Sequence, residues 1–305
     1  MRQAFSDALV GIAMADPNVL LLTGDHGYAL FDDFRRLCSK QYINAGIAEQ
    51  NMVGMAAGLA RGGFRPIVYG LSAFIPMRVL EQIKLDVAHD NLPVIFIGDG
   101  AGFVYSHLGT SHQSTEDIAC TRAIPNLSVY SPADRFELTH CLNLAYQAKS
   151  AVYLRMGKSD RGDVHVEPPG SSVSKLHKVH SDQSCAISII ATGSLVKTAL
   201  DIVRKDGINA NVWSAPFIKP IDVEQVVEIC KKSHAVIVLE EHNKFGGLGS
   251  VIAEISSEAF PVKILRIGVK DRFSHSCGTY DHLLKEHGLD RVSALNQIQD
   301  FLATN

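Results

Sequence analysis

The sequence predicts an α/β protein built from two doubly wound domains with mainly parallel sheets. Short, nearly continuous apolar runs alternate with helix-like segments in both halves of the chain, as in strands and helices of α/β domains. Such runs suit parallel strands that are covered on both faces. The 305 residues also suffice for two domains of ordinary size. We expect a first domain at 1–160, a linker at 161–183 and a second domain at 184–305.

Apolar runs in the first half predict buried strands, and the segments between them predict the helices that cover the sheet. The strands are expected at 18–24, 65–70, 92–100, 126–132 and 151–157, and the helices at 2–14, 47–62, 76–90, 113–122 and 133–148. At the start of the last helix, Ser131 can act as a cap and Pro132 suits the first turn.

The expected linker is polar and contains the sequence Pro168–Pro169–Gly170, which is typical of turns and connections. A second strand–helix alternation follows it. Strands are expected at 185–193, 209–215, 235–242 and 262–268. One helix is expected to follow the first strand and to end near 206, and others are expected at 222–232 and around 247–258, before two C-terminal helices. Repetition of the pattern predicts a second α/β domain.

Composition and charge indicate which partners and which cellular location to expect. Hydrophobic residues make up 46% and charged residues 20%, as in a soluble globular protein, and a net charge of −3 gives no reason to expect nucleic acid or an anionic membrane. Asp7, Asp16 and Pro17 interrupt the apolar N-terminal runs, so we expect a cytoplasmic protein without a spanning segment. Its six cysteines lack metal-ligand spacing and are expected to be reduced and mostly buried.

One acid stands out in the segment "INAGIAEQNMVGMAAGLA" at 43–60. This segment predicts a helix that is small and apolar nearly all round, and therefore buried. Glu49 falls in its first turn, where the helix dipole favours an anion. A dipole-satisfying acid and a buried acid that handles one specific proton are both compatible with this position.

The segment "GIAEQNMVGMAAGLA" resembles the glutamate-bearing helix of the pyrimidine-binding domain in transketolases and 1-deoxyxylulose-5-phosphate synthases. The resemblance continues through "GLSAFIPMRVLEQIKLDVAHDNLPVIFIGDGAG" and "LGTSHQSTEDIACTRAIPNLSVYSPAD". It resumes in "ISIIATGSLVKTALDI" and "VIVLEEHNKFGGLGSVIAEI", which are similar to the C-terminal domain of the family. The chain begins where the family's diphosphate-gripping N-terminal domain would end, so it resembles the C-terminal subunit of a split transketolase.

This resemblance implies a catalytic role for Glu49. In the family such a glutamate hydrogen-bonds N1′ of thiamine diphosphate (ThDP) and favours the imino form of its 4′-amino group, which removes the proton from thiazolium C2. The implied activity is transfer of a two-carbon ketol unit from a ketose to an aldose. A separate N-terminal subunit would hold most of the Mg²⁺ and diphosphate contacts, in an α₂β₂ assembly that also implies self-association.

Further residues are assigned to the cofactor by the same resemblance. Phe74, in "SAFIPMR", matches the aromatic residue that stacks on the pyrimidine, and Ile47 and Leu71 match apolar walls of that pocket. Asp25 follows a predicted strand, where open α/β sheets place ligands. It resembles a family aspartate near the cofactor, with an ordinary turn acid as the alternative.

On the substrate side, the resemblance assigns His112 to proton transfers at the donor hydroxyls. Arg155 matches an arginine at the substrate mouth, although a domain-linking salt bridge is equally compatible. Leu108, preceded by His107, replaces an aspartate of ordinary transketolases, and Gly100 stands where they carry a phosphate-binding histidine. These departures imply a sugar of different stereochemistry, or one without the usual terminal phosphate.

Two other motifs have ordinary explanations. The GDG tripeptide at 98–100, together with Asn126, imitates the family's metal-binding pattern, but it lies on the pyrimidine-type domain, so no metal is assigned to Asp99 and Asn126. Glycines in "EEHNKFGGLGS" could leave backbone N–H groups free for an anion. A tight structural turn is the preferred interpretation, because the family's C-terminal domain has no essential part in cofactor binding.

Two alternatives to a transketolase subunit remain at this point. One is a subunit similar to 1-deoxyxylulose-5-phosphate synthase or to the β subunit of a 2-oxoacid dehydrogenase E1, which would consume pyruvate and release carbon dioxide. The other is a binding or scaffolding subunit that has kept the fold without the chemistry.

Overall fold

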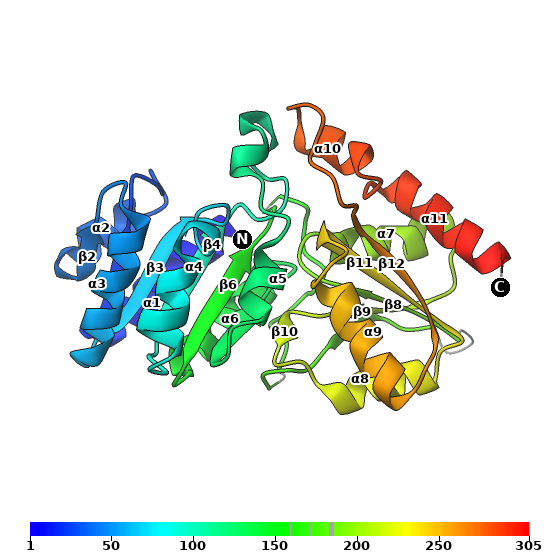
Figure 1. The fold of residues 1–305 in the computed structure, drawn as a ribbon, viewed down its shortest axis with the longest axis horizontal. Coiled ribbons are helices and arrows are strands. Elements are labelled where there is room, and N and C mark those ends of the chain that lie inside the picture. The colour runs from blue at the N-terminus through cyan, green and yellow to red at the C-terminus, as the bar shows by residue number, and fades with distance from the viewer. Residues whose placement is uncertain (159, 171, 183–185, 305) are drawn as a thin grey trace.

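The computed structural model describes residues 1–158, 160–170, 172–182 and 186–304. Within these ranges the chain forms two twisted sheets that lie side by side, each with helices on both faces (Figure 1). The predicted fold class is therefore confirmed. None of the described helices combines the length and apolar character needed to cross a bilayer.

The first sheet is parallel except at one edge. Its strands run in the order β10 (Phe217–Lys219), β5 (Leu127–Tyr130), β6 (Ala151–Met156), β4 (Ile95–Asp99), β3 (Arg65–Leu71), β1 (Val19–Thr23) and β2 (Tyr42–Asn44). Only β10 is antiparallel to its neighbour among these strands of the described chain. It comes from the second half of the sequence, so the two domains share a sheet edge.

Alternate residues of these strands feed two apolar layers, as expected for a sheet covered on both faces. One layer packs against α1 (Arg2–Ala15), α2 (Asp32–Leu37) and α6 (Arg135–Gln147). The other packs against α3 (Glu49–Arg61), α5 (Asp117–Arg122) and the segment 77–88. That segment, predicted as one long helix, is a 3₁₀ turn at Met77–Val79, a short α4 (Leu80–Gln82) and a π-helical turn at Ile83–Ala88.

The second sheet has the order β12 (Lys263–Val269), β11 (Ala235–Asn243), β8 (Ile187–Ala191), β9 (Asn211–Ser214) and β7 (His177–His180). Its helices are α7 (Leu195–Asp206), α8 (Val223–Lys231), α9 (Leu248–Ala259), α10 (Tyr280–Glu286) and α11 (Arg291–Ala303). Strand β7 lies inside the range predicted as a linker. The sequence did not predict it, because its four residues are too few and too polar to give a strand pattern. The described residues 157–158, 160–170 and 172–176 belong to the connection that precedes it, and His165 of this connection contacts Asp134 and Glu137 of the first domain.

Candidate functional site

The carboxyl edge of the first sheet carries the buried acid of the "GIAEQ" segment. Glu49 begins α3, and only 3% of it is exposed. Its Oε1 is buried and accepts no hydrogen bond within the described part of the chain. Burial alone would raise the pKa of Glu49, but the backbone N–H of its own helix turn and the Arg78 guanidinium outweigh burial and lower it. Oε1 therefore has capacity to accept a hydrogen bond.

Rings and cations surround that acceptor. Arg78 Nη1 lies 3.0 Å and His26 Nε2 3.8 Å from Glu49 Oε1. The Arg78 guanidinium also lies over the Phe74 ring, 4.1 Å from its centroid. The His112 ring meets the Phe74 ring edge-on, with 5.3 Å between centroids, and the His26 ring centroid lies 6.1 Å from that of Phe74. The structure thus brings together Glu49, Phe74 and His112, three residues that the sequence assigned to one site.

The other residues predicted to contact the cofactor differ in exposure. Ile47 is 75% exposed just before α3, and Leu71 is half-buried at the end of β3. Asp25 is exposed and accepts a hydrogen bond of 2.5 Å from the Tyr28 hydroxyl, as a turn acid would. Ile47 precedes Glu49 by two residues, and its exposed side chain is open to a ligand or a neighbouring subunit.

His112 lies on a loop that the second domain supports. The loop forms two 3₁₀ turns, at Ser106–Leu108 and Thr110–His112, and meets α10 at the top of Figure 1. Ser274 donates a hydrogen bond of 2.8 Å to Gln113 Oε1, directly after His112. His107 and Leu108 are exposed at the first turn. The second domain therefore helps to position the predicted substrate side of the site.

Arg155 has a different environment. Only 2% of it is exposed, and its Nε donates to Asp117 Oδ2 at 2.7 Å. Nη2 donates to the carbonyl oxygens of Glu241, at 2.8 Å, and Ser114, at 3.3 Å. Because Glu241 belongs to β11, this geometry favours the domain-linking interpretation of Arg155 over an open position at a substrate mouth.

Gly100 has a structural reason to lack a side chain. Its φ is +75°, and a Cβ atom there would lie 2.0 Å from Cε2 of Tyr105. The Tyr105 ring therefore fills the space of a side chain at position 100, and its hydroxyl donates to Asp99 Oδ2 at 3.0 Å. Tyr105 is thus a residue of this edge that sequence reasoning missed.

The GDG tripeptide and Asn126 do not come together. Asp99 ends β4, and its Oδ2 accepts hydrogen bonds from the hydroxyls of Tyr69, at 2.7 Å, and Tyr105. Asn126 precedes the first residue of β5 and donates to the Ala88 carbonyl. Since β4 and β5 run in the same direction, the two residues lie at opposite edges of the sheet.

In the second domain, a carboxylate of the chain itself binds the backbone N–H groups of the "EEHNKFGGLGS" segment, which could otherwise have bound an anion. Glu240 accepts the backbone N–H groups of Leu248 and Gly249 at the start of α9, at 2.7 and 2.8 Å. Burial raises the pKa of Glu240 to about 7, against the lowering effect of these two hydrogen bonds. The glycine-rich turn is therefore a packed structural turn, as preferred from the sequence.

Sequence reasoning also missed Arg78 and His26 as neighbours of Glu49. Arg78 stands within the quoted "SAFIPMR" segment and His26 follows Asp25, so both were next to assigned residues. A cation four residues after an aromatic residue that matches the pyrimidine-stacking position was a usable signal. Proximity of His26 to Glu49 depends on the pairing of β1 with β2 and β3 and had no local signal.

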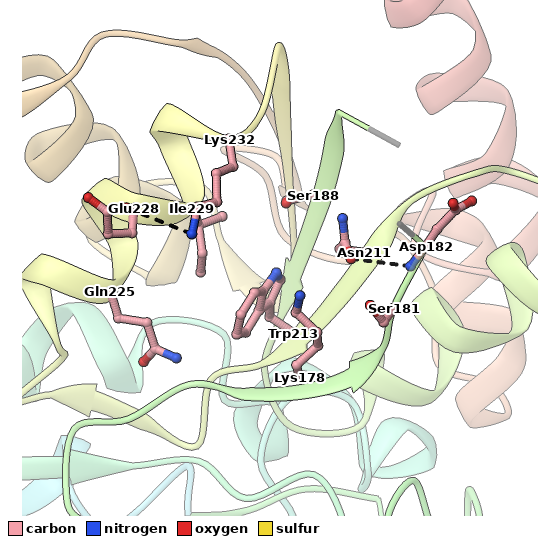
Figure 2. A pocket seen from close by; sticks show the side chains of 10 residues that line it. All are labelled: Lys178, Ser181, Asp182, Ser188, Asn211, Trp213, Gln225, Glu228, Ile229 and Lys232. Atoms are coloured by element: carbon pink, nitrogen blue, oxygen red, sulfur yellow. Dashed lines mark hydrogen bonds and ion pairs between the residues drawn. The ribbon is translucent and has the colours of Figure 1, made fainter. Parts of the chain in front are cut away.

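A cavity also lies in the second domain. Figure 2 shows a cavity of about 520 Å³ in the second domain, with Trp213 and Lys178 on its wall. The Lys178 ammonium lies 4.7 Å from the Trp213 ring centroid. None of the residues that the sequence singled out lines it.

Comparison with known proteins gives the family. Residues 1–162 match the model of the transketolase pyrimidine-binding domain, and residues 177–293 match that of the transketolase C-terminal domain. The chain belongs to the transketolase family. It is 32% identical to one of the subunits of the apulose-4-phosphate transketolase of Phocaeicola vulgatus, across 99% of this chain and 97% of that protein.

Two further similarities define which part of a transketolase this is. A solved structure titled as a split gene transketolase, an inactive β4 tetramer, superposes with a TM-score of 0.89 at 31% identity and covers 98% of this chain and 97% of that chain. Against the 1-deoxy-D-xylulose-5-phosphate synthase of Pasteurella multocida, the chain is 33% identical but spans 48% of the protein. The chain is therefore a C-terminal transketolase subunit, and its family is one of ThDP-dependent transferases.

Proposed function

We propose that the chain supplies the pyrimidine half of a ThDP site and works with a separate N-terminal subunit. The complex would transfer a two-carbon ketol unit from a ketose, as a phosphate or a modified sugar, to an aldose. The observation that carries this proposal is Glu49, a buried carboxylate whose Oε1 accepts no hydrogen bond among the described residues and lies next to an aromatic ring.

The residues present fit an aminopyrimidine. Oε1 of Glu49 has an ion-pair partner, Arg78, but no hydrogen bond, so a ligand N–H or protonated ring nitrogen can complete it, and the Phe74 ring lies close by for stacking. When bound, ThDP would supply an acidic carbon and an electron sink for carbon–carbon bond cleavage. Glu49 would hold a proton between its Oε1 and the pyrimidine ring nitrogen, and α3 would keep that acid away from water.

Arg78 would act as a stand-in for the pyrimidine in the free chain. It uses the two groups that the cofactor needs, the Glu49 oxygen at 3.0 Å and the Phe74 face at 4.1 Å. Its side chain is 45% exposed, so it can turn toward solvent at modest cost. Removal of this cation would also allow the pKa of Glu49 to rise toward that of an acid that shares a proton.

His112 would serve the sugar. Its ring contacts Phe74, and it lies on the loop that also exposes Leu108 and His107. A neutral imidazole there can accept and return protons at donor hydroxyls near neutral pH. Leu108 and Tyr105 would shape the end of the sugar that ordinary transketolases read through an aspartate and a histidine.

A partner would complete the site. The GDG acid of this chain is occupied by tyrosines, so we assign the Mg²⁺ and diphosphate contacts mainly to an N-terminal subunit, in an α₂β₂ complex. The similar split-gene structure is titled as an inactive tetramer of β chains alone, which supports a need for such a partner. A cytoplasmic location belongs to the same proposal.

Mixing defines the first experiment. The chain is purified alone and with the N-terminal transketolase subunit encoded next to it, and ThDP–Mg²⁺ binding and ketol transfer are measured over a panel of ketoses. Binding and transfer in the mixture alone support the proposal. Pyruvate consumption with carbon dioxide release would instead favour a 1-deoxyxylulose-5-phosphate-synthase-like or E1β-like subunit. Full activity with Glu49→Ala would reject the catalytic role and leave a scaffolding subunit.

A further inference from the structure

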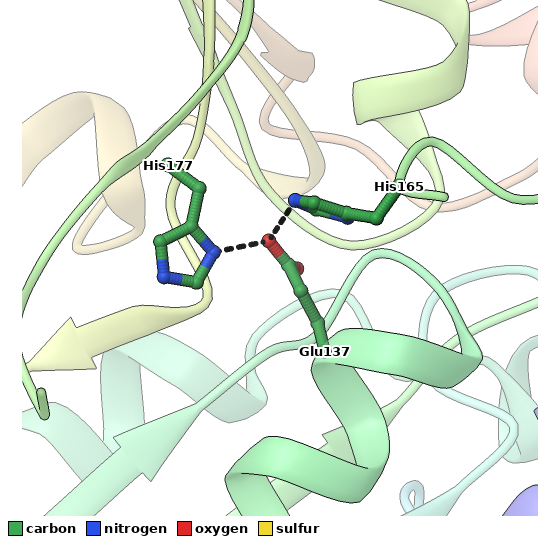
Figure 3. Close-up of side chains that lie close together, drawn as sticks. All are labelled: Glu137, His165 and His177. Carbon is green, nitrogen blue, oxygen red and sulfur yellow. Dashed lines mark hydrogen bonds and ion pairs between the residues drawn. The ribbon is translucent and has the colours of Figure 1, made fainter. Parts of the chain in front are cut away.

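Three side chains meet where the two domains join, away from the predicted cofactor site. Figure 3 shows Glu137, from the first turn of α6, between His165 of the connection and His177, the first residue of β7. One ligand atom from each lies within 4.8 Å of the other two. The three residues therefore come from the first domain, the connection and the second sheet.

The distances leave one ring nitrogen unused. His177 Nδ1 is 2.9 Å from Glu137 Oε1, and His165 Nε2 is 3.5 Å from the same oxygen. The side chains of Glu137, His177 and His165 are 0%, 8% and 12% exposed. His165 Nε2 is buried, and no hydrogen bond to it is found within the described ranges. A buried polar nitrogen of this kind points to an additional bonding partner.

Neighbouring groups hydrogen-bond His165 and Glu137 and orient them, as is usual for metal ligands. His165 Nδ1 lies 3.0 Å from Asp134 Oδ2, which leaves Nε2 directed at the cluster. Glu137 Oε2 accepts the Ala133 N–H at 2.8 Å, which leaves Oε1 directed at the two histidines. A carboxylate behind a ligating histidine, and a backbone donor behind a ligating carboxylate, are the recurring supports of metal sites.

We propose that Glu137, His165 and His177 bind one Zn²⁺ ion, or another divalent transition-metal ion, that ties the two domains together. Two imidazoles and a carboxylate form a ligand set suited to zinc and cobalt and poorly suited to Mg²⁺. Bonds of about 2.0–2.1 Å to a tetrahedral ion separate ligand atoms by roughly 3.3 Å. The His165 distance already fits, and the His177 distance has to open by a few tenths of an ångström.

One groove gives the metal ion access to the cluster and can also supply its fourth ligand. His165 and His177 both line a groove of about 660 Å³, together with residues 164–170 of the connection, residues 178–179 of β7 and Arg204. An ion can enter through this groove, and a water molecule from it can fill the fourth position. The bound ion would fix the connection and β7 against α6 without taking part in ketol transfer.

Metal titration of the full chain tests the proposal. The protein is stripped with a chelator, held under a reducing agent and titrated with ZnCl₂ by calorimetry, and Co²⁺ absorption reports tetrahedral coordination. We expect one Zn²⁺ per chain, undisturbed by millimolar Mg²⁺, and a rise in Tm with Zn²⁺. His165→Gln and His177→Gln should each weaken binding by more than about 100-fold, and Asp134→Asn by about 10- to 100-fold.

Controls separate this site from adventitious binding. His180→Gln changes a half-buried histidine of the same strand, outside the cluster, and should bind as wild type does. Exposed Cys277 is changed to Ser in every protein tested. His165 lies outside helices and strands, so its variant should fold, as circular dichroism can check. Absence of stoichiometric Zn²⁺ binding by wild type, or binding unchanged in both His→Gln variants, would overturn the proposal.

Discussion

Two buried glutamates whose carboxylates lie at helix N-termini behave in opposite ways: Glu49 is the first residue of α3, and Glu240 reaches α9 from strand β11. Glu49 begins α3 and keeps one oxygen without a hydrogen bond, while Glu240 gives both oxygens to the first N–H groups of α9. Burial opposes ionisation of both acids, but the backbone N–H at the start of α3 and the Arg78 guanidinium outweigh it and lower the pKa of Glu49, whereas burial raises that of Glu240 to about 7. Burial beside a helix N-terminus is therefore common to both acids and does not distinguish them. The feature on which the proposed role of Glu49 depends is its oxygen without a hydrogen bond, close to the half-buried Phe74 ring.

The same contrast extends to the surroundings of the two acids. Around Glu49, Arg78 and His112 are partly open to solvent and can be rearranged by a ligand. Around Glu240, the neighbouring Glu241 accepts from Phe103 N–H at 2.7 Å and Arg155 donates to its carbonyl oxygen. The first region is partly open to solvent, as the proposed cofactor site requires, and the second links the two domains.

Of the substitutions considered, neutralising Glu49 should cause the largest loss of activity. In the reconstituted complex, Glu49→Gln should lower kcat by about 10²- to 10⁴-fold, because the side chain can no longer share a proton with the cofactor. Ketol transfer at saturating ThDP measures this. Glu240→Gln serves as the control and should leave kcat within a few-fold. Equal losses of kcat in the two variants would erase the distinction between the acids.

Arg155 tests the domain junction. Arg155→Met leaves Asp117 buried without its cation and should lower the free energy of unfolding by about 3–5 kcal/mol. Urea unfolding measures this, with Arg135→Met as control, since its exposed pair with Asp163 should contribute about 1 kcal/mol or less. A stable Arg155→Met protein with a selective loss of kcat/KM for phosphorylated donors would restore the substrate-mouth assignment.

Glu240 should make stability fall with rising pH. Its pKa is about 7 in the folded chain, against an ordinary value of 4.5, so the folded state holds more protons between these values. The free energy of unfolding should therefore drop by about 3 kcal/mol from below pH 4.5 to pH 7. Urea unfolding at several pH values should show this drop flattened in Glu240→Gln. Glu49, with its lowered pKa, should contribute stability above pH 4.5 that is lost as pH falls.

The sequence predicted the fold class because buried parallel strands are continuous apolar runs. It missed β2, β7 and β10, whose three or four residues are strands only because a neighbouring strand pairs with them. Ser131 was expected to cap α6, but Asp134 does so, accepting from the N–H groups of Phe136 and Glu137. Boundaries of this kind depend on tertiary contacts rather than on local pattern.

Part of the site was predictable and part was not. Glu49, Phe74 and His112 were assigned from motifs, and the structure places them together. Whether Arg155 faces a substrate or a second domain could not be decided locally, because its burial depends on β11. The cluster of Glu137, His165 and His177 had no sequence signal, since its members are far apart in the chain and meet only across the domain junction.

A substitution of Phe74 tests the region around Glu49 without changing its charges. Phe74→Ala removes the stacking surface and should raise the ThDP concentration at half-maximal activity by roughly three- to tenfold, as expected for loss of about 1 kcal/mol. Phe245→Ala, at an exposed phenylalanine of the second domain, is the matched control. An unchanged ThDP requirement would remove Phe74 from the cofactor site and leave it as a contact of Arg78 and His112.

Leu108 is expected to give the smallest effect, on substrate choice alone. It is 47% exposed on the His112 loop, so an aspartate there can be solvated and should not disturb the fold. Leu108→Asp should raise kcat/KM for ordinary sugar phosphates relative to the native donor by about fivefold, the value of one hydrogen bond to a sugar hydroxyl. Leu108→Asn separates hydrogen bonding from charge. If the ratio of kcat/KM values stays the same in both variants, the specificity of the site must come from elsewhere on this edge, and Tyr105, which fills the space beside Gly100, becomes the residue to change.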